Sequence, residues 1–521
     1  MVNTRNKEWM VNQAIVKRSG PFIQFSADGE RPLPADVVGE LEKPLYYTHL
    51  SFEWAQMRFG NGSENSINAE TRRLFQYDEQ GLLVAQKGFL SKLRAVLTAQ
   101  GYACEVIDCN EPKAENIYES DWDSVFEKFN LRPQQDVCLA QIDMHDGGII
   151  DAITAFGKMY ILAMVCALYR NAKIDIVVSR KDVAENICRL VTKYVADVGR
   201  VGGGKKKKGR VTVYTAKSLH HSDFDADIVL ADEVHELVTD ANAAQISRYH
   251  NARMFGFTAS KETRMDNAHY RLEGLFGPTI FKIDYQTGES LGLVVPMTVQ
   301  WLDVQTTVNP CKGVSNITQQ KRWGIWRHDN RNKIIAEMAN AYFKEGKQVL
   351  ILVDTVDHLL HLRKYLPDFS ICCGENARVN SDDRLKQTYV SAGLMEPDEV
   401  LMNVQRREQT RKDFERREIF GVIATGVWAV GVSFDGLNVL MRADGADSET
   451  ANIQLPGRVC RTDDKTGKQC GILVDCMDYW DRKFKDRSYN RRRSYGTRGW
   501  TQVKSDGSIW NPVSRSGRAK I

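Results

Sequence analysis

The segment 151–160, DAITAFGKMY, keeps part of the phosphate-binding pattern G-x-x-x-x-G-K-[ST]. Ala152 stands at the first glycine position, and Met159 stands where the pattern ends in a hydroxyl residue. Gly157 allows the backbone to approach a phosphate because it has no Cβ. Lys158 would place a cation on that phosphate, and a helix beginning there would offer free N–H groups. The loop predicts a nucleotide site, although a single G-K pair is a weak signal by itself.

An acidic pair follows an apolar strand in the segment 227–233, DIVLADE. Such a strand would deliver Asp232 and Glu233 to the carboxyl end of a parallel sheet, where ligands bind. Asp232 could hold Mg²⁺ directly or through water, and Glu233 could orient and deprotonate a water molecule. Acidic pairs also occur exposed in loops, but the preceding strand and the earlier G-K loop favour an ATP-hydrolysing site.

Two arginines lie three residues apart in the segment 454–461, QLPGRVCR. On a helix, Arg458 and Arg461 would share one face. Their guanidinium groups suit a γ-phosphate whose charge is shifting, which is the arginine-finger role. Surface arginine pairs are common, so this motif gains meaning from its place in a second α/β domain, where it would suggest ATP held between two such domains.

Short apolar, β-branched runs alternate with helical segments from about residue 126 onward. Continuous apolar strands between helices indicate a parallel sheet that is covered on both faces. The runs form two series: 174–179, 211–215, 227–233 and 254–260, and then 348–354, 420–425, 438–444 and 471–476. Two series predict two α/β domains, joined near residues 303–325, with a polar insertion or long loop at roughly 375–410.

The composition is ordinary for a globular protein of 521 residues, with 42% apolar and 26% charged residues. No apolar run reaches the roughly 18 residues of a membrane span, and the first residues carry no apolar stretch that could act as a secretion signal. Eleven scattered cysteines without a C-x-x-C pair indicate neither a disulfide framework nor a zinc site, which predicts reduced thiols in the cytoplasm.

The C-terminal segment 481–521 is strongly basic, with 12 Lys and Arg against 3 Asp and Glu. It interleaves arginines with Tyr495, Trp500 and Trp510, so rings could stack on unpaired bases while cations meet phosphates. Two alternatives stay open at this point: a solvated disordered end, and a folded cap in which Trp500 is buried.

Taken in order, these segments resemble the motifs of the superfamily 2 helicases. The matching segments are AITAFGKM (motif I, 152–159), VVSRKDVAENI (motif Ia, 177–187), VTVYTAKSL (211–219), DEVH (motif II, 232–235), FTAS (motif III, 257–260), ATGVWAVGVSFD (motif V, 424–435) and QLPGRVCR (motif VI, 454–461). Upstream, LRPQQ (131–135) resembles the element that reads adenine in related helicases. The resemblance implies an α/β chain with two tandem RecA-like parallel-sheet domains.

A finer resemblance concerns the UvsW-type phage helicases, which have XPB- and RecG-like relatives. KPLYYTHLSFEWAQMRFG and LFQYDEQGLLVAQKGFLSKLRAVLTAQGY resemble their small N-terminal domain, and GGGKKKKGRVTVYTAKSL resembles their glycine-lysine loop. We therefore expect a small α+β N-terminal domain over 1–125, RecA-like domains over 126–305 and 306–480, and a basic C-terminal extension over 481–521.

The resemblance also implies roles for residues at the matching positions. The residues expected to contact ATP and Mg²⁺ are Gln135, Ala155, Phe156, Gly157, Lys158, Met159, Asp232 and Asp435. The residues expected to take part in ATP hydrolysis are Lys158, Asp232, Glu233, Gln454, Arg458 and Arg461. Nucleic-acid contacts fall to Arg180, Gly203, Gly204, Lys205, Thr215 and Thr425, and coupling to strand movement falls to His235, Thr258 and Ser260. The run 205–208 would add salt-dependent affinity for nucleic acid, unless it is a solvated loop.

Met159 is the main departure from the family pattern, because a thioether is a poor ligand for a hard cation. Either Asp232 and waters hold Mg²⁺ without it, or Tyr160 or Thr154 helps, or hydrolysis is weak. We favour the first alternative, because Mg²⁺ usually keeps several waters.

The leading interpretation is an ATP-dependent DNA helicase or translocase that acts on branched or duplex DNA in recombination, repair or replication, in the host cytoplasm if a phage encodes it. ATP would close the two RecA-like domains and hydrolysis would reopen them, which moves a strand. One alternative is an RNA helicase. The other, which Met159 favours, is an ATP-gated clamp or remodelling factor that hydrolyses slowly.

Overall fold

The computed structural model describes residues 12–53, 66–259, 267, 269–374, 377–428, 434, 436–447, 452, 456–463 and 466–510. The chain divides into two compact units. The first contains the described residues up to Ile283 except Ile153–Ala155, and the second contains Ile153–Ala155 and the described residues from Asp284 onward. Among the described residues, no helix is both long and apolar enough to cross a membrane.

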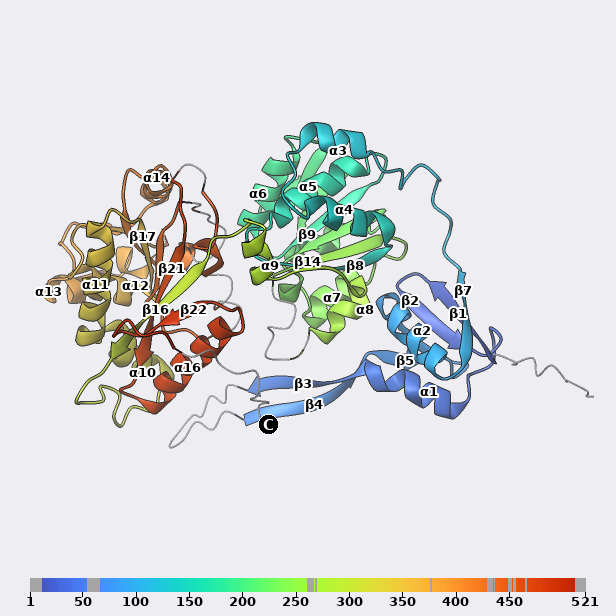
Figure 1. The fold of residues 1–521 in the computed structure, drawn as a ribbon, viewed down its shortest axis with the longest axis horizontal. Coiled ribbons are helices and arrows are strands. Elements are labelled where there is room, and N and C mark those ends of the chain that lie inside the picture. Colours follow the sequence, from blue (N-terminus) through green and yellow to red (C-terminus); the bar gives the residue numbers. More distant parts are fainter. Residues whose placement is uncertain are drawn as a thin grey trace, which may run out of the picture. The chain divides into compact units, whose positions relative to one another are not determined.

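The first unit begins with a small domain built on a five-stranded sheet in the order β5-β6-β2-β1-β7. Its strands are β1 (Asn12–Ser19), β2 (Phe22–Ser26), β5 (Phe75–Tyr77), β6 (Leu83–Gln86) and β7 (Tyr102–Asp108). Helices α1 (Ala35–Glu42) and α2 (Leu90–Ala99) bury Leu41 and Leu93 in one core with the sheet. Strands β3 (Tyr46–Glu53) and β4 (Ser66–Arg73) form a separate antiparallel pair (Figure 1).

The rest of the first unit is an eight-stranded sheet in the order β11-β10-β12-β9-β13-β14-β8-β15. Its strands are β8 (Gly147–Ala152), β9 (Ile174–Val178), β10 (Val198–Gly202), β11 (Lys205–Lys207), β12 (Val211–Thr215), β13 (Ile228–Asp232), β14 (Arg253–Thr258) and β15 (Thr279–Ile283). All pairs are parallel except β10 with β11. Every residue of β9, β12 and β13 is buried, because helices cover both faces of the sheet.

The second unit contains a seven-stranded sheet in the order β18-β19-β17-β20-β21-β16-β22. Its strands are β16 (Met297–Val304), β17 (Val349–Leu352), β18 (Ser370–Cys372), β19 (Gly421–Ala424), β20 (Val439–Arg442), β21 (Gly471–Asp478) and β22 (Thr501–Val503), and all pairs are parallel. The prediction of two tandem RecA-like domains is confirmed, because each series of apolar runs forms one covered parallel sheet (Figure 1).

The polar interval near 375–410 is not a long loop in its described part. It contains helix α13 (Asp383–Ser391) and the start of helix α14 (Val404–Glu415). Leu401 and Met402 between these helices are buried in the core of the second domain. The segment is polar on average, so its few core residues were not predicted from the sequence.

The described part of the basic C-terminal segment is folded as part of the second unit. Helix α16 (Arg482–Gly496) packs against β21, and β22 pairs with β16. Trp500 is 7% exposed, and its ring lies 5.7 Å from that of Tyr495. The interpretation of a disordered end therefore does not apply to residues 482–510, whereas residues 511–521 lie outside the described part.

Buried ion pairs join helices α16 and α11 (Asp329–Lys344) to the seven-stranded sheet. Arg491 donates two hydrogen bonds to the carboxylate of Asp475, at 2.9 and 3.0 Å, and the Tyr495 hydroxyl donates to it at 2.8 Å. Arg331 pairs with Asp478 at 2.9 Å, and all of these groups are nearly inaccessible to solvent. A buried charge that loses its partner costs several kcal/mol, so each pair ties helix placement to sheet formation.

We expect Arg491→Met to destabilise the second unit by roughly 3–5 kcal/mol, because it leaves the Asp475 carboxylate buried without its cation. Urea unfolding followed by limited proteolysis of the second unit measures the change. Arg493→Met on the exposed side of the same helix is the matched control, with an expected change within roughly 0.5 kcal/mol. Equal stabilities of the two variants would contradict this role for Arg491.

Candidate nucleotide site and nucleic-acid interface

The lysine loop, the acidic pair and Thr258 follow three adjacent strands, which end at one edge of the first RecA-like sheet. Strand β14 lies between β8 and β13, and the register pairs Thr258 with Asp151 and Asp232 with Phe257. Helix α5 (Lys158–Leu168) follows β8 after a five-residue loop, 153–157. Because the three strands are parallel, their carboxyl ends meet at one edge, which is where ligands bind in such sheets.

The backbone of the loop before α5 has a shape that allows a phosphate to approach closely. Ala155 and Gly157 both adopt the left-handed region, with φ of 85° and 90°. A Cβ on Gly157 would lie 2.8 Å from the side-chain nitrogen of Gln135, so packing and backbone geometry both require glycine there. Left-handed alanine is strained, and such strain is typical of loops that bind ligands.

Gln135 lies at the start of helix α4 (Gln135–Met144) and is buried. Its Nε2 donates to the carbonyl of Phe156 at 2.8 Å, and its Oε1 accepts from the backbone N–H of Arg132 at 3.0 Å. The Gln135 side chain therefore holds the loop 153–157 against the start of helix α4. The adenine contact predicted for Gln135 remains a prediction, because the amide would have to release one of these bonds to make it.

Lys158 begins α5, and its Nζ donates to the carbonyl of Ala152 at 3.1 Å. Phosphate oxygens could replace that carbonyl, since they accept the same N–H groups and carry charge. Phe156 is fully buried and stacks on Phe281 at 5.3 Å, so it anchors the loop. Met159 is half-buried on the first turn of the helix.

Asp232 is the last residue of β13, and its carboxyl is buried. Burial and the negative charge of neighbouring Glu233 raise the pKa of Asp232 to about 7, while the Lys158 ammonium opposes that rise. Within the described residues, Oδ1 of Asp232 accepts no hydrogen bond. A buried carboxylate oxygen in this state fits a divalent cation, because Mg²⁺ binds through one or two carboxylates and keeps its waters.

His235 joins motif II to motif III inside the first domain. Its Nδ1 lies 3.0 Å from the hydroxyl of Thr258 and 3.4 Å from a carboxylate oxygen of Glu233. Glu233 itself adopts a left-handed conformation, with φ of 49°. The ring therefore contacts both the predicted water-orienting group and the end of the neighbouring strand, which suits the coupling role that the sequence predicts.

Arg180 and the Gly203–Lys207 segment both belong to the first RecA-like domain, where Arg180 follows strand β9 and the segment forms part of the β10–β11 hairpin. Arg180 is the N-cap residue of helix α6 (Lys181–Val191), and it pairs with Glu236 at 3.5 Å. Gly203 and Gly204 form the turn of the β10–β11 hairpin, with φ of 62° and 86°. Lys205–Lys207 is an exposed edge strand rather than a loop, which keeps its side chains available to an anion.

Thr215 ends β12, and its hydroxyl lies 2.5 Å from that of Ser218. A Cβ on Gly202 would lie 2.7 Å from the Thr215 hydroxyl, so the hairpin and this strand end fit closely. Sequence reasoning missed Ser218 and also Glu236, which binds Ser179 and Arg180. The sequence signal for Glu236 was an acidic residue directly after the DEVH box, whereas its contact with motif Ia appears only in the structure.

The second unit holds the remaining predicted residues that the structure describes. Arg458 is 8% exposed and ends a 3₁₀ turn, Pro456–Arg458, whereas Arg461 forms an isolated bridge with Val294. The expectation that both arginines share one helix face is therefore not met, because the chain leaves the turn before Arg461. Thr425 follows β19 and is buried, with its N–H donating to Cys372 at 2.9 Å. Ser260, Asp435 and Gln454 lie outside the described residues.

Comparisons with known proteins follow the same division of the chain. Residues 128–263 match the domain family "Type III restriction enzyme, res subunit", and residues 330–463 match "Helicase conserved C-terminal domain". No curated protein sequence matches the chain.

Similar solved structures share little sequence with the chain. UvsW of bacteriophage T4 is 15% identical, with 94% of this chain and 99% of that chain covered and a TM-score of 0.41. A putative HsdR subunit fragment from Vibrio vulnificus is 13% identical, with coverages of 90% and 94% and a TM-score of 0.49. S. cerevisiae Dbp5 bound to RNA and ADP BeF3 is 14% identical, with coverages of 75% and 94% and a TM-score of 0.47.

We expect Asp232→Asn to stabilise the protein in the absence of nucleotide and metal. The folded state raises the pKa of Asp232, so ionising this group costs stability as pH rises from about 4 to about 7. The amide removes that cost, and at pH 8 in EDTA the melting temperature of the first unit should rise by roughly 2–4 °C. Scanning calorimetry at pH 5 and pH 8 measures it, and the gain should shrink at pH 5. A lower melting temperature at pH 8 would contradict the buried charge.

Proposed function

The chain belongs to helicase superfamily 2, and we propose that it is an ATP-dependent DNA helicase or translocase that acts on branched or duplex DNA. ATP use follows from that family, with Mg²⁺ as its typical partner. The observation that carries the proposal is the edge of the first sheet, where Lys158 donates to the carbonyl at the end of β8 and its charge acts on the buried carboxyl of Asp232 at the end of β13.

Each residue at this edge has a distinct role in the proposed reaction. The loop amides, the start of α5 and Lys158 would bind the phosphates, and Asp232 would hold Mg²⁺ with its waters. Bound MgATP supplies a phosphoanhydride bond whose hydrolysis can drive motion. Glu233 would orient and deprotonate the attacking water, and His235 would transmit changes at Glu233 to Thr258. The arginine-finger role of Arg458 and Arg461 remains a prediction.

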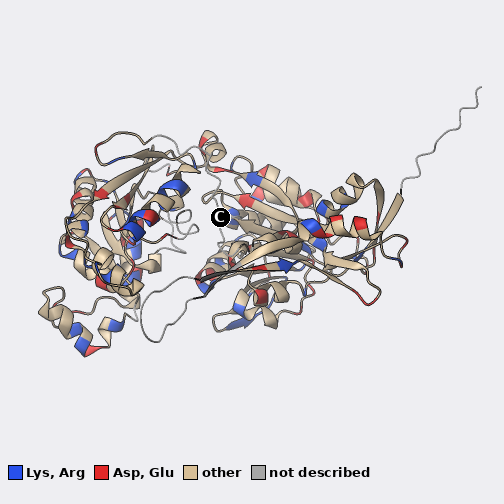
Figure 2. Ribbon diagram, turned by 90° about the horizontal axis from the view of Figure 1, so that it is seen from below, with Lys and Arg blue, Asp and Glu red and all other residues tan. Residues whose placement is uncertain are grey.

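Nucleic-acid binding is proposed for Arg180, the Gly203–Gly204 turn and the Lys205–Lys207 strand. Backbone N–H groups, hydroxyls and cations at phosphates give position without reading sequence. Lysine and arginine are interspersed with acidic residues over each unit, so affinity would depend on local clusters rather than on overall charge (Figure 2). The exposed lysine strand is one such cluster, and its contribution should fall with salt.

DNA is favoured over RNA by the UvsW-like features of the N-terminal and glycine–lysine segments. A role in recombination, repair or replication rests on the same resemblance. An RNA helicase is the first alternative. The second is a slowly hydrolysing ATP-gated clamp, and the half-buried Met159 thioether at the start of α5 favours it.

A panel of nucleic acids tests these alternatives directly. We expect ATPase activity to rise at least tenfold with single-stranded or forked DNA and to respond less to RNA of the same sequence. Four-way and forked DNA should be unwound or remodelled only with hydrolysable ATP. Greater stimulation by RNA would favour the first alternative, and tight DNA binding with a turnover that DNA does not raise would favour the second.

We expect Lys158→Ala to abolish ATPase activity and to leave DNA affinity within about threefold, because Lys158 serves the phosphates rather than the strand. Lys193→Ala, an exposed lysine of the same domain, is the matched control with normal activity. Steady-state ATPase assays and fluorescence anisotropy measure both effects. Normal turnover of Lys158→Ala would mean that the loop is not the phosphate site.

Met159→Thr restores the hydroxyl of the usual loop pattern. We expect its ATPase activity to equal or exceed that of the wild type at limiting Mg²⁺, because a hydroxyl can bind the cation or its waters. Titration of Mg²⁺ at saturating DNA measures the effect. A strong loss of activity would show that the thioether has a packing or catalytic role of its own.

A further inference from the structure

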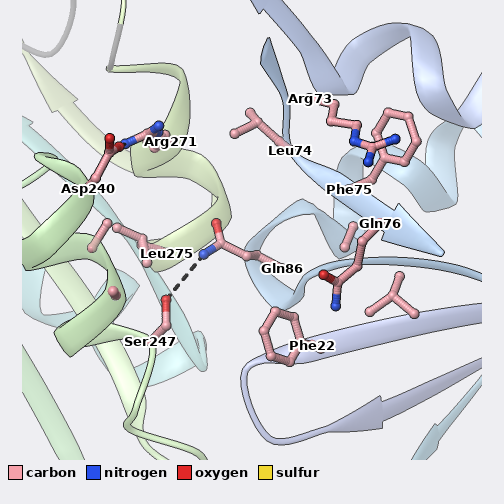
Figure 3. A pocket seen from close by; sticks show the side chains of 14 residues that line it. Phe22, Arg73, Leu74, Phe75, Gln76, Gln86, Asp240, Ser247, Arg271 and Leu275 are labelled. Atoms are coloured by element: carbon pink, nitrogen blue, oxygen red, sulfur yellow. Dashed lines mark hydrogen bonds and ion pairs between the residues drawn. The ribbon is translucent and has the colours of Figure 1, made fainter. Parts of the chain in front are cut away.

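An open cavity of about 340 Å³ lies at the surface of the first unit, and none of its lining residues belongs to the nucleotide motifs. It forms where β5 and β6 of the small N-terminal domain face helices α7 (Asp240–Ile246) and α8 (Tyr270–Phe276) of the RecA-like domain (Figure 3). Its volume falls within the range of small-molecule sites, which run from roughly 300 to 1,000 Å³.

The walls of this cavity are fixed by close packing. The backbone around Gly88 lies so near α8 that an added Cβ would approach the carbonyl of Glu273 to 1.9 Å. Lys87 is half-buried and donates to the carbonyl of Ala252 at 2.8 Å, and Gln86 donates to the Ser247 hydroxyl at 3.3 Å. The small domain is therefore docked firmly on the RecA-like domain, and the cavity exists before any ligand arrives.

Aromatic and aliphatic groups supply its apolar surface. Phe75 is 7% exposed, and its ring is held edge-on by Tyr46 at 5.3 Å and Tyr77 at 5.9 Å. Phe22 is 40% exposed, and Figure 3 shows its ring near the amide of Gln76, whereas the amide of Gln86 points toward Ser247. A flat ring of a ligand could stack on such surfaces while its polar edge meets the two amides.

The charges at the cavity favour an anion. Asp240 is paired with Arg271, and Arg72 lies 3.6 Å from the same carboxylate, so its charge is compensated. Both arginines lower the pKa of Asp240 and keep it ionised. Arg73 lines the cavity, is exposed, and extends over the Phe75 ring at 6.0 Å. Its guanidinium is placed to bind a phosphate at the mouth.

We propose that this cavity binds one unpaired nucleotide of the strand, with its base among Phe22, Leu74 and Leu275 and its phosphate at Arg73. This inference rests on the proposed nucleic-acid function. Stacking surfaces, amides that match a base edge and a surplus cation together describe a nucleotide better than a peptide. Helix α7 follows the DEVH turn closely, so the bound nucleotide would anchor the strand on the domain that carries Asp232.

Two surface variants test the proposal in the full-length chain. Binding of single-stranded oligothymidylate and oligouridylate is measured by anisotropy, with melting temperatures confirming that each variant folds. Phe22→Ala should weaken binding about tenfold, which is within the range for one base stacked on an aromatic ring. Arg73→Gln should weaken binding and reduce the salt slope by about 0.7, the value for one phosphate contact on a single strand.

Matched controls separate local effects from general ones. Phe126→Ala removes another exposed ring, and Arg94→Gln removes another exposed cation of the small domain, so both should bind as the wild type does. Strands that carry one 5-iodouracil should cross-link to a peptide containing Phe22 or Phe75. Such mapping, together with weakened binding, supports the nucleotide cavity.

The opposite results have distinct meanings. If DNA or RNA stimulates ATPase activity but Phe22→Ala and Arg73→Gln bind it normally, the cavity does not take a nucleotide, whereas the proposed motor function survives. Cross-links that map only to other regions would overturn the inference in the same way. If no nucleic acid binds or stimulates the wild type, the proposed function fails, and the inference that rests on it fails with it.

Discussion

The carboxylate of Asp232 is the constraint on which the first RecA-like domain depends. Folding buries it at the end of a fully apolar strand, next to Glu233, and its pKa rises to about 7. A lone carboxylate in such a place opposes folding unless a cation joins it. Lys158 is the protein's own nearby cation, and it opposes the rise without cancelling it. The sheet therefore holds a negative site that a bound metal would stabilise.

The arrangement around that carboxylate follows from strand order. Strand β14 lies between β8 and β13. The loop that leads to Lys158 and the pair Asp232–Glu233 therefore lie at the same edge of the sheet, on either side of Thr258. His235 then contacts the Thr258 hydroxyl and Glu233 at once. A change at the phosphates would reach the neighbouring strand through two short contacts, which is a simple physical basis for coupling hydrolysis to motion.

The second unit uses charge in a different way. Arg331 and Arg491 are fully buried against Asp478 and Asp475, so these cations stabilise the fold and do not meet a ligand. The count of basic residues in the C-terminal segment therefore overstates the charge that its described part offers to a polyanion. Arg492 also lies over Trp510 at 3.9 Å, inside the same cap.

The sequence by itself determined the two parallel sheets, because continuous apolar runs such as 174–179 and 348–354 can only be buried on both faces. It also placed Lys158 at the start of a helix and Asp232 at the end of a strand, since both positions follow from local pattern. Only the tertiary structure decided that Gln135 holds the Phe156 carbonyl, that Lys205–Lys207 is an edge strand, and that Trp500 is buried beside Tyr495. The cavity near Phe22 and Arg73 also belongs to this group. These features join residues that are distant in the chain or depend on a neighbouring strand, and no local spacing encodes such contacts.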